Sequence, residues 1–569
     1  MISKIKQQSL YLILLQGASR AISFLFNLWI YDILYAQKQD VASFALINFR
    51  FPLIRDALLD FSRSGYRRAF ARTDTQNKAT LPTIFTIVPL SAIPFGIIFS
   101  ILTYLLELSG SGTDLENYSL LLGLLCFTTW LELVSEPFYI VMQSLVHFDV
   151  RMKVEGLAAI TRSISLYLII RFFNMPLFAF SISQFLCSFI TFLGYGFYYI
   201  SDKRVTSKEK PNDLKGFRIF FKIIPNFRKL FHLDQNAKEM LKLVGSFTLQ
   251  NVFVFVLTTI GDIILLTFRN FEIEAIYGLA NNIGSLGLRI VYFPIEETIY
   301  TLISLKVASL EKEKEKQNLK ENQKEKEKEN QKRKSKRKSK IKKKIKKKIK
   351  IKIKTKLLML KFKKFIKIFL VFRLVFLIAF FYSVFGSNYT FLFTKFMIDN
   401  KPKSEISLII GFYFIYTFFV IMNGINEIFV RSVSSKSQLF KNNILLVVFS
   451  GLYIAFIYTF APRYGSMGFI LANILNKSVS GIYFAYFTYK YFTSFKVSFN
   501  QFFLDSRVTL ACFFIAIILF SSSYFFWIGV YGLFIHFIIG IFCFLLLCGF
   551  VYKFEKRTWK ELLSKKKTD

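Results

Sequence analysis

Fourteen apolar stretches, each close to the length of a membrane-crossing helix, run through this sequence between residues 9 and 552. About 20 apolar residues cross a bilayer as a helix, and a lipid-embedded helix satisfies its own backbone hydrogen bonds. We therefore expect an all-α polytopic membrane protein with about 14 transmembrane helices. The expected spans are 9–34, 41–62, 80–106, 118–146, 156–170, 176–200, 240–268, 275–305, 365–394, 405–430, 442–461, 467–489, 508–528 and 531–552.

Composition excludes several other classes of protein. Of the 569 residues 53% are hydrophobic, and the five cysteines all lie in apolar stretches, so a disulfide scaffold is not predicted. The three histidines are isolated from one another and from the cysteines, so no metal-ligand spacing is present. No phosphate-binding Walker loop is visible either. We predict no cofactor, no bound metal and no ATP-driven transport by this chain.

The distribution of basic residues predicts the topology. The loops on the side of the two termini carry 32 Lys and Arg, outside the 306–364 segment, whereas the opposite loops carry 7. Because basic loops stay in the cytosol, both termini are expected to be cytosolic. The apolar stretch from Leu10 to Leu34 is too long for a cleavable signal sequence, and we expect it to act as the insertion signal.

The net charge of +40 is concentrated in one segment. Residues 311–356 hold 24 Lys and Arg against 7 Glu, and the topology accounts for the rest, so nucleic-acid binding is not predicted. The segment could bind anionic lipid headgroups on the cytosolic face. A low-complexity insertion without such a role is the favoured alternative, because the whole chain is rich in Lys, Ile and Phe.

Polar connections divide the chain. A cytosolic linker with two prolines follows the sixth predicted span and separates two groups of six helices. We expect an N-terminal six-helix lobe at 1–200, the linker at 201–239, a C-terminal six-helix lobe at 240–489 interrupted by the basic low-complexity insert at 311–364, and two extra helices with a basic cytosolic tail at 490–569.

Polar and charged residues inside the predicted spans are the candidate functional residues. Such residues are costly in lipid unless they face water or a partner. Each by itself also fits an internal ion pair or interhelical hydrogen bond. Together they indicate a basic, polar cavity that suits an anionic, sugar-bearing solute. The candidate binding residues are Arg20, Arg63, Arg67, Arg68, Asn281, Asn282, Arg289 and Asn473, and the candidate structural or gating residues are Glu132, Glu136, Pro137, Pro294, Glu296, Glu297 and Glu427.

Five segments that contain these residues follow the motifs of one family in the same order. They are Ser62–Ala69 (S-R-E-x-[FY]-R-R-A), Glu132–Phe138 (E-L-x-x-E-P-[FWY]), Tyr277–Tyr300 (N-N-x-G-S-L-x-x-R-x-x-[FY]-x-P-I-E-E), Asn423–Glu427 (N-G-x-x-E) and Gly468–Asn473 (G-F-I-L-A-N). The chain thus resembles the eukaryotic oligosaccharide-translocation family, the Rft1-type proteins of the endoplasmic reticulum. Two departures are Ser64, where the family has an acidic residue, and Asp262, which lacks the family's basic partner.

The resemblance implies a fold and a function. It implies two six-helix lobes facing each other across a central cavity, as in multidrug exporters and lipid-linked cell-wall precursor flippases, with two extra C-terminal helices. It implies a non-enzymatic role in N-linked glycosylation in the endoplasmic reticulum membrane: translocation of pentamannosyl-chitobiosyl-diphosphodolichol from the cytosolic to the lumenal leaflet. A non-transporting accessory factor, associated with the glycosylation machinery, is the alternative, and a cation-coupled exporter of the same superfamily is a further one.

A glycosyltransferase is disfavoured, because Asp114 and Glu116 are the only candidate lumenal carboxylates and they lie in a short loop.

The polar residues suggest how such a lipid could be handled. A diphosphate-linked glycan cannot enter hydrocarbon without replacement partners for its charges and hydroxyls. We expect Arg63, Arg67, Arg68 and Arg20 to grip the diphosphate near the cytosolic mouth and the asparagines to contact the glycan, while the two lobes rock. A simple positive-inside anchor is the alternative role of the first three arginines. Glu296 and Glu297 are expected to pair with Arg289 and to fix the lobe geometry.

Two acceptor sequences for N-glycosylation lie on the predicted lumenal side. They begin at Asn117 and Asn388. Both are close to predicted spans, so we treat them as candidate sites only.

Overall fold

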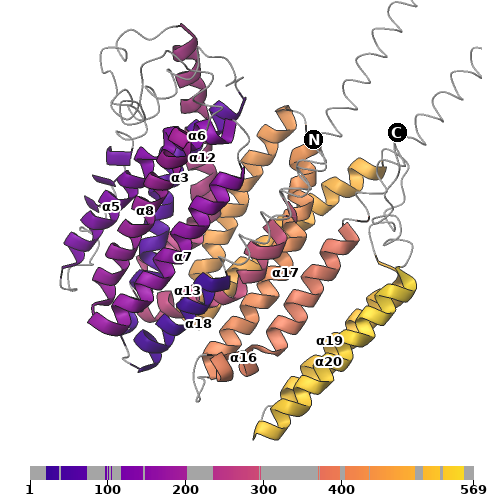
Figure 1. Ribbon diagram of the computed structural model, residues 1–569. Helices are drawn as coiled ribbons and strands as arrows, with labels where there is room; N and C mark the ends of the chain where they lie inside the picture. Colours follow the sequence, from indigo (N-terminus) through magenta and orange to yellow (C-terminus); the bar gives the residue numbers. More distant parts are fainter. Residues whose placement is uncertain are drawn as a thin grey trace, which may run out of the picture. The chain divides into compact units, whose positions relative to one another are not determined.

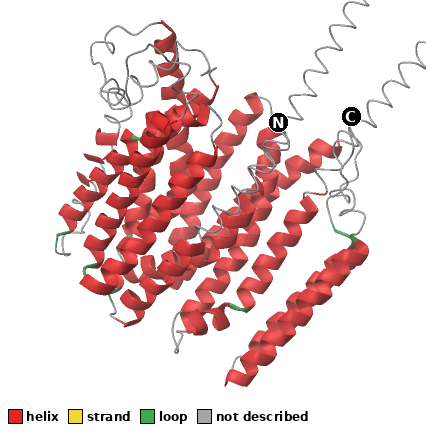
Figure 2. Ribbon diagram, in the orientation of Figure 1, coloured by secondary structure: helices red, strands yellow, loops and turns green. Residues whose placement is uncertain are grey.

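The computed structural model describes most of the predicted spans and is helical throughout them, with no strand in the described residues (Figures 1 and 2). These residues are 21–37, 40–72, 96–98, 100–101, 104–105, 117–144, 148–201, 235–268, 270–293, 295–296, 370, 372–397, 404–434, 436–493, 504–525 and 529–555. Most of the predicted third span and the whole basic insert lie outside them.

The helices up to residue 201 follow the predicted order. Residues 21–31 are helical, and they are followed by η1 (Asp32–Gln37), α2 (Val41–Ala45), η2 (Leu46–Arg50), α3 (Phe51–Arg72), α5 (Tyr118–Val134), α6 (Glu136–Ser144), α7 (Phe148–Phe173) and α8 (Pro176–Ser201). The η elements are π-helical turns, which insert one residue per turn and often occur at functional sites.

The helices after residue 234 are longer on average. They are α12 (Gln235–Thr267), α13 (Phe271–Gly284), η3 (Leu288–Tyr292), the helical residues 372–388, α16 (Thr390–Met397), α17 (Ser404–Val433), α18 (Lys436–Thr493), α19 (Ser506–Phe525) and α20 (Gly529–Phe554).

Within these residues, eight helices are long and apolar enough to cross a membrane, and two shorter apolar helices are Ala21–Tyr35 and Phe372–Asn388. The eight include one 50-residue stretch in α18, which is in fact two helices joined at Gly465. Gly465 has φ +54° and ψ −131°, a backbone conformation that favours glycine. The break lies between the predicted spans 442–461 and 467–489. The chain is therefore a multi-pass, all-helical membrane protein.

The chain folds into two compact units. The first contains Met1–Leu286, Phe393–Ile410 and Ser450–Ala472, and the second contains Gly287–Leu392, Gly411–Phe449 and Asn473–Asp569. The units do not follow the predicted lobes, because the first unit joins segments from both sides of the 201–239 linker. The lobe assignment stays a prediction.

In the first unit, α7 packs along α8, α8 along α5, and α3 along α12. The α3–α12 contact is close because Gly65 faces α12: a Cβ at this position would lie 3.0 Å from the carbonyl oxygen of Val244. The ring of Phe61 packs edge-on against Phe255 in the same contact, with centroids 5.1 Å apart. α13 packs against α2 and η2. Segments before and after the linker are thus joined within one unit.

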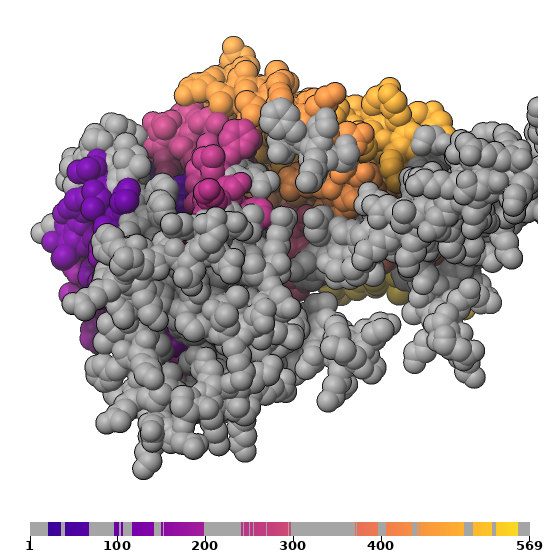
Figure 3. Space-filling view, turned by 90° about the horizontal axis from the view of Figure 1, so that it is seen from above, coloured from indigo at the N-terminus to yellow at the C-terminus, as the bar shows by residue number. Residues whose placement is uncertain are grey.

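In the second unit, α19 and α20 form a hairpin. One face of it is a core that includes Val508, Leu519 and Leu547. The other faces expose large apolar side chains, such as Phe542, which is 65% exposed. Helices that are apolar on all sides suit a lipid environment. In the space-filling view the orange and yellow surface belongs to the helices after residue 370 (Figure 3).

Candidate functional site: a charged network in the first unit

A helix break places two glutamates against α3. The predicted span 118–146 is interrupted at Ser135, between α5 and α6. Pro137 lacks an N–H and cannot continue the hydrogen-bond ladder, so α6 restarts at Glu136 with proline at its second position. The Ser135 hydroxyl donates to the Glu132 carbonyl oxygen over 2.7 Å and caps the end of α5. Glu132 lies just before the break and Glu136 just after it.

Three arginines on α3 face these glutamates. Arg55, Arg63 and Arg67 fall within about 120° of one another around the helix, at about 100° per residue. Residues on the other side of α3, such as Gly65, face α12 instead. The sequence of α3 therefore presents a basic face to α5 and α6 and a small-residue face to α12.

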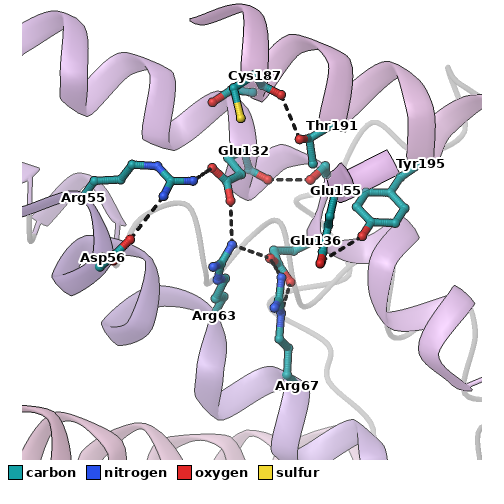
Figure 4. Close-up of polar contacts among 12 residues, drawn as sticks. Arg55, Asp56, Arg63, Arg67, Glu132, Glu136, Glu155, Cys187, Thr191 and Tyr195 are labelled. Carbon is teal, nitrogen blue, oxygen red and sulfur yellow. Dashed lines mark hydrogen bonds and ion pairs between the residues drawn. The ribbon is translucent and has the colours of Figure 1, made fainter. Parts of the chain in front are cut away.

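The five groups form a ladder of alternating charge (Figure 4). Glu132 accepts from Arg55 Nη2 over 2.6 Å and from Arg63 Nη1 over 2.7 Å. Glu136 accepts from Arg67, with 2.9 Å between Arg67 Nε and Glu136 Oε2, and lies 3.6 Å from Arg63 Nη1. Each carboxylate is thus shared between two arginines.

The ladder is largely removed from solvent. The side chain of Glu136 is 2% exposed and that of Glu132 11%, while the three arginines are each about a fifth exposed or less. Ion pairs in such surroundings are screened little, and removal of one partner leaves an uncompensated buried charge. We conclude that the ladder ties α3 to the α5–α6 break.

Further contacts extend the ladder toward α7 and α8. The Arg67 guanidinium lies over the Tyr139 ring, 3.8 Å from its centroid. Arg151 pairs with Glu155 one turn along α7 over 3.1 Å, and the Tyr195 hydroxyl donates to Glu155 over 3.2 Å. Two of the contacting residues, Tyr139 and Tyr195, are buried.

These contacts bear on the predicted grip of the diphosphate. Arg63 and Arg67 both have carboxylate partners in this structure, so an incoming phosphate would compete with Glu132 and Glu136 for them. The side chain of Arg68 and the whole of Arg20 lie outside the described residues. The binding role of the four arginines stays a prediction.

A second ion pair in the first unit is not among the predicted site residues. Arg50, in the π-helical turn η2, donates to Glu274 of α13 through Nη2 over 2.6 Å and Nε over 3.3 Å. Glu274 is fully buried and Arg50 is 5% exposed. The Arg50 guanidinium also lies 5.1 Å from the centroid of the Phe271 ring. The partners are 224 residues apart in the chain, which hides the pair from any local sequence pattern.

Two of the predicted asparagines lie beside this pair on α13. Asn282 donates through Nδ2 to Asn48 Oδ1 over 3.3 Å, which joins α13 to η2 a second time. Asn281 accepts through its carbonyl oxygen from the Ser285 backbone N–H over 2.9 Å. The Phe49 and Tyr277 rings meet edge-on with centroids 5.7 Å apart. Asn282 thus belongs to a packed contact between η2 and α13.

The remaining predicted residues lie in the second unit. Glu427 accepts from Arg431 on the same helix and, over 3.5 Å, from Asn423. Electrostatic neighbours of Glu296 include Glu427, Arg431 and Lys477. The expected pairing of Arg289 with Glu296 stays a prediction.

Arg289 lies in η3, and Asn473 on α18 is buried. Pro294 and Glu297 fall outside the described residues.

The two candidate glycosylation sites differ in their surroundings. Asn117 is exposed and precedes α5 in the left-handed conformation, with φ +65°. Asn388 ends a helix, and its amide donates to the Val384 carbonyl oxygen over 2.7 Å and accepts from Ser523 over 3.1 Å. Its backbone carbonyl also contacts the buried His536 ring. These contacts disfavour modification of Asn388, whereas Asn117 is available.

Metal ligation has no support in the described part of the chain. No group of three or more His, Cys, Asp or Glu side chains there could hold a metal ion.

Solved structures of two transporters have a similar fold. The chain is similar to the lipid II flippase MurJ in its inward closed conformation, with a TM-score of 0.55 and 15% identity over 95% of this chain and 99% of that chain. It is also similar to an outward-facing multidrug resistance MATE family transporter, with a TM-score of 0.52 and 13% identity over 86% and 96%. The chain therefore shares the fold of these two transporters.

The sequence comparison identifies the family of the chain. Residues 4–565 match the Rft protein family, and the chain belongs to it. A relative from Dictyostelium discoideum, the "Man(5)GlcNAc(2)-PP-dolichol translocation protein RFT1", is 30% identical over 98% of this chain and 96% of its own length. The protein of the same name from Mus musculus is 24% identical over 82% and 78%. The resemblance given by the five motifs is confirmed.

Proposed function

We propose that this protein translocates a dolichol-diphosphate-linked oligosaccharide of the Man5GlcNAc2 class from the cytosolic to the lumenal leaflet of the endoplasmic reticulum membrane. Membership of the Rft family over nearly the whole chain, with the named Dictyostelium relative at 30% identity, is the observation that carries the proposal. The transporter fold supports a non-enzymatic role.

The proposal includes a finer architecture. It places about 14 spans in two six-helix lobes, 1–200 and 240–489, followed by two extra helices, with both termini in the cytosol. The helix break at Gly465, between two of the predicted spans, and the asymmetry of the basic loops support it. In this topology the start of α13 and the start of the second span face the lumen.

The physical task is to carry a diphosphate and its sugars past hydrocarbon. Unpaired charges and hydroxyls lose several kcal/mol each, to order of magnitude, when they leave water without new partners. A bundle whose membrane-embedded helices carry many arginines and asparagines can supply those partners. The polyprenyl tail needs none and remains in lipid.

The proposal assigns the diphosphate contact at the cytosolic side to Arg63, Arg67, Arg68 and Arg20, and the glycan contacts to Asn281, Asn282, Arg289 and Asn473. Arg63 and Arg67 are already shared with carboxylates. Binding of the diphosphate there must therefore weaken the ladder, which couples substrate arrival to a movement of α3 against the α5–α6 break.

The Arg50–Glu274 pair fits a gate on the lumenal side. It joins a segment of the first proposed lobe to one of the second, and the Asn48–Asn282 bond and the Phe49–Tyr277 contact lie beside it. A state open to the lumen would have to separate these groups. We propose that the pair holds the lumenal side closed until the substrate is bound.

The test of the function is the profile of dolichol-linked oligosaccharides in cells depleted of the protein and in the same cells rescued by the intact gene. The proposal predicts accumulation of the Man5GlcNAc2 intermediate and underglycosylated proteins, both reversed by rescue. An unchanged profile would contradict it. A changed profile together with no translocation by the purified protein would favour the accessory role.

A further inference from the structure

Arg162, in the first unit, has no acidic partner among the residues that the structure describes. Arg162 lies near the middle of α7, and its side chain makes no hydrogen bond or ion pair with any residue in the described ranges. Among these residues its guanidinium makes a cation–π contact with the Phe180 ring, whose centroid lies 5.3 Å from the guanidinium carbon. An arginine carries five N–H donors and stays charged in proteins. All five are therefore unused by the described residues.

An unpaired guanidinium is costly at the depth of Arg162 in the membrane. It lies 11 residues before the last residue of α7, which at about 1.5 Å per residue is about 16 Å. This is about half of the roughly 30 Å hydrocarbon thickness. Arg162 is partly exposed. A guanidinium at this depth is costly unless water or an anionic partner meets its exposed part.

The neighbouring charges do not balance it. Electrostatic neighbours of Arg162 include Arg55, Asp56 and Glu132. Glu132 is already shared between Arg55 and Arg63, and Asp56 is paired with Arg55 over 3.2 Å while its side chain is 64% exposed. Among the described residues, the ladder together with Asp56 and Arg162 holds four arginines and three carboxylates. One positive charge remains over.

A second unused donor lies in the same surroundings. Arg55 Nε is buried and has no hydrogen-bond partner in the described part of the chain, although the Nη atoms of the same side chain donate to Asp56 and Glu132. Buried donors are rarely left unsatisfied, and each one calls for an explanation such as a missing ligand. Arg55 and Arg162 are electrostatic neighbours, so both sets of unused donors lie around one region between α3, α7 and α8.

A neutral partner would not remove the imbalance. Gln184 lies on the same face of α8 as Phe180, one turn along, and its buried Oε1 also has no hydrogen-bond partner. A hydrogen bond from an Arg162 N–H would satisfy this oxygen. Because an amide carries no charge, the excess positive charge would remain.

We propose that Arg162, together with the free Nε of Arg55, forms an anion site halfway across the membrane that takes the diphosphate of the translocated lipid. The identity of the ligand rests on the proposed function, whereas the existence of an anion site does not. Guanidinium groups bind phosphate oxygens in a bidentate manner, and two of them suit a group with two phosphates. The site gives the diphosphate a resting place between the two leaflets.

The test uses the purified full-length protein in detergent, with inorganic diphosphate and farnesyl diphosphate as probes. Binding is measured as the rise in unfolding temperature with probe concentration, since a ligand that binds the folded state stabilises it. The variants are Arg162→Gln and, as the matched control, Arg171→Gln, which changes an exposed arginine at the end of the same helix. We expect at least a tenfold weaker affinity for Arg162→Gln and no change for the control.

Stability separates a binding role from a structural one. Arg162 has no carboxylate partner to orphan, so Arg162→Gln should unfold at or above the wild-type temperature when no probe is present. Unchanged probe affinity in this variant would overturn the proposal. If Arg162→Gln loses diphosphate binding while the oligosaccharide profile of depleted cells is normal, the anion site is supported and the proposed function is contradicted. If Arg162→Gln binds diphosphate as the wild type does while depletion changes the oligosaccharide profile, only the anion site is contradicted.

A measurement on the unmodified protein covers the case in which the variant does not fold. Phenylglyoxal, which reacts with accessible guanidinium groups, is applied with and without inorganic diphosphate, and modified peptides are identified by mass spectrometry. The proposal predicts that Arg162 reacts and that diphosphate protects it, whereas Arg171 reacts equally in both conditions. An Arg162 that does not react, or that reacts equally with diphosphate present, would contradict the site.

Discussion

The Arg50–Glu274 ion pair allows the sharpest prediction about stability. Glu274 is fully buried, Arg50 is 5% exposed, and two hydrogen bonds join them. Removal of one partner of such a pair costs about 3–5 kcal/mol, because the other charge is left buried and alone. Since 1.4 kcal/mol corresponds to a factor of ten, the folded population should fall by roughly two to three and a half orders of magnitude.

The two single substitutions should not be equal. A guanidinium cannot lose its proton in a protein, whereas an isolated carboxylate can take one up. Glu274→Gln, which strands Arg50, should therefore cost more than Arg50→Gln, which strands Glu274. The double variant should cost less than the sum of the two, with a coupling energy of about 2 kcal/mol or more, within the range that contacting residues show.

The assay is denaturant unfolding of the purified protein in mixed micelles, followed by tryptophan fluorescence. Arg431→Gln is the matched control, because Arg431 pairs with Glu427 on one helix but is 45% exposed, and such pairs contribute under about 1 kcal/mol. The reasoning would be refuted if Arg50→Gln and Arg431→Gln lowered the free energy of unfolding equally. It would also be refuted if the double variant at Arg50 and Glu274 lost the sum of the two single losses.

Three further predictions concern the first unit and the helix breaks. Glu132→Gln removes the carboxylate that lies nearest to Arg55 and Arg63 and should lower stability by about 3 kcal/mol, whereas Asp56→Asn, at a side chain 64% exposed, should change it by under about 1 kcal/mol in the same unfolding assay. Gly465→Ala forces a side chain into a positive-φ conformation and should cost about 1–3 kcal/mol; Gly451→Ala, in open space on the same long helix, should be neutral or stabilising, and the reverse order would contradict the assignment of the break. A glycosidase-sensitive shift in electrophoretic mobility, if the chain carries a glycan, should disappear in Asn117→Gln, and a shift that survives would place the glycan elsewhere.

The sequence predicts the helices better than the contacts between them. Span lengths follow from the bilayer thickness and are readable one helix at a time. The break at Ser135 follows from Pro137, and the break in α18 falls where the two predicted spans meet, because proline and glycine act locally. The π-helical turns at Arg50 and Arg289 have no such local signal, and they interrupt the continuous helices that the sequence predicts there.

In the candidate site, too, single residues can be predicted from the sequence but their distant partners cannot. Glu132 and Glu136 stand out in the sequence as charges in an apolar stretch, but their partners on α3 are 69 to 77 residues away. Glu274 does not stand out, because it sits at the start of a helix, where a glutamate is ordinary. Its importance comes from burial against Arg50, and burial depends on how distant helices pack.

The central claim is that this chain moves a diphosphate-linked oligosaccharide across a membrane. The most direct measurement reconstitutes the purified protein into vesicles with Man5GlcNAc2-diphosphodolichol and follows transfer of the glycan between leaflets by its accessibility to an added lectin, with protein-free vesicles as the control. The account predicts that transfer is accelerated by the wild-type protein and reduced by Arg162→Gln, which keeps its fold. Transfer no faster than in protein-free vesicles, with the protein shown to be folded, would contradict the account.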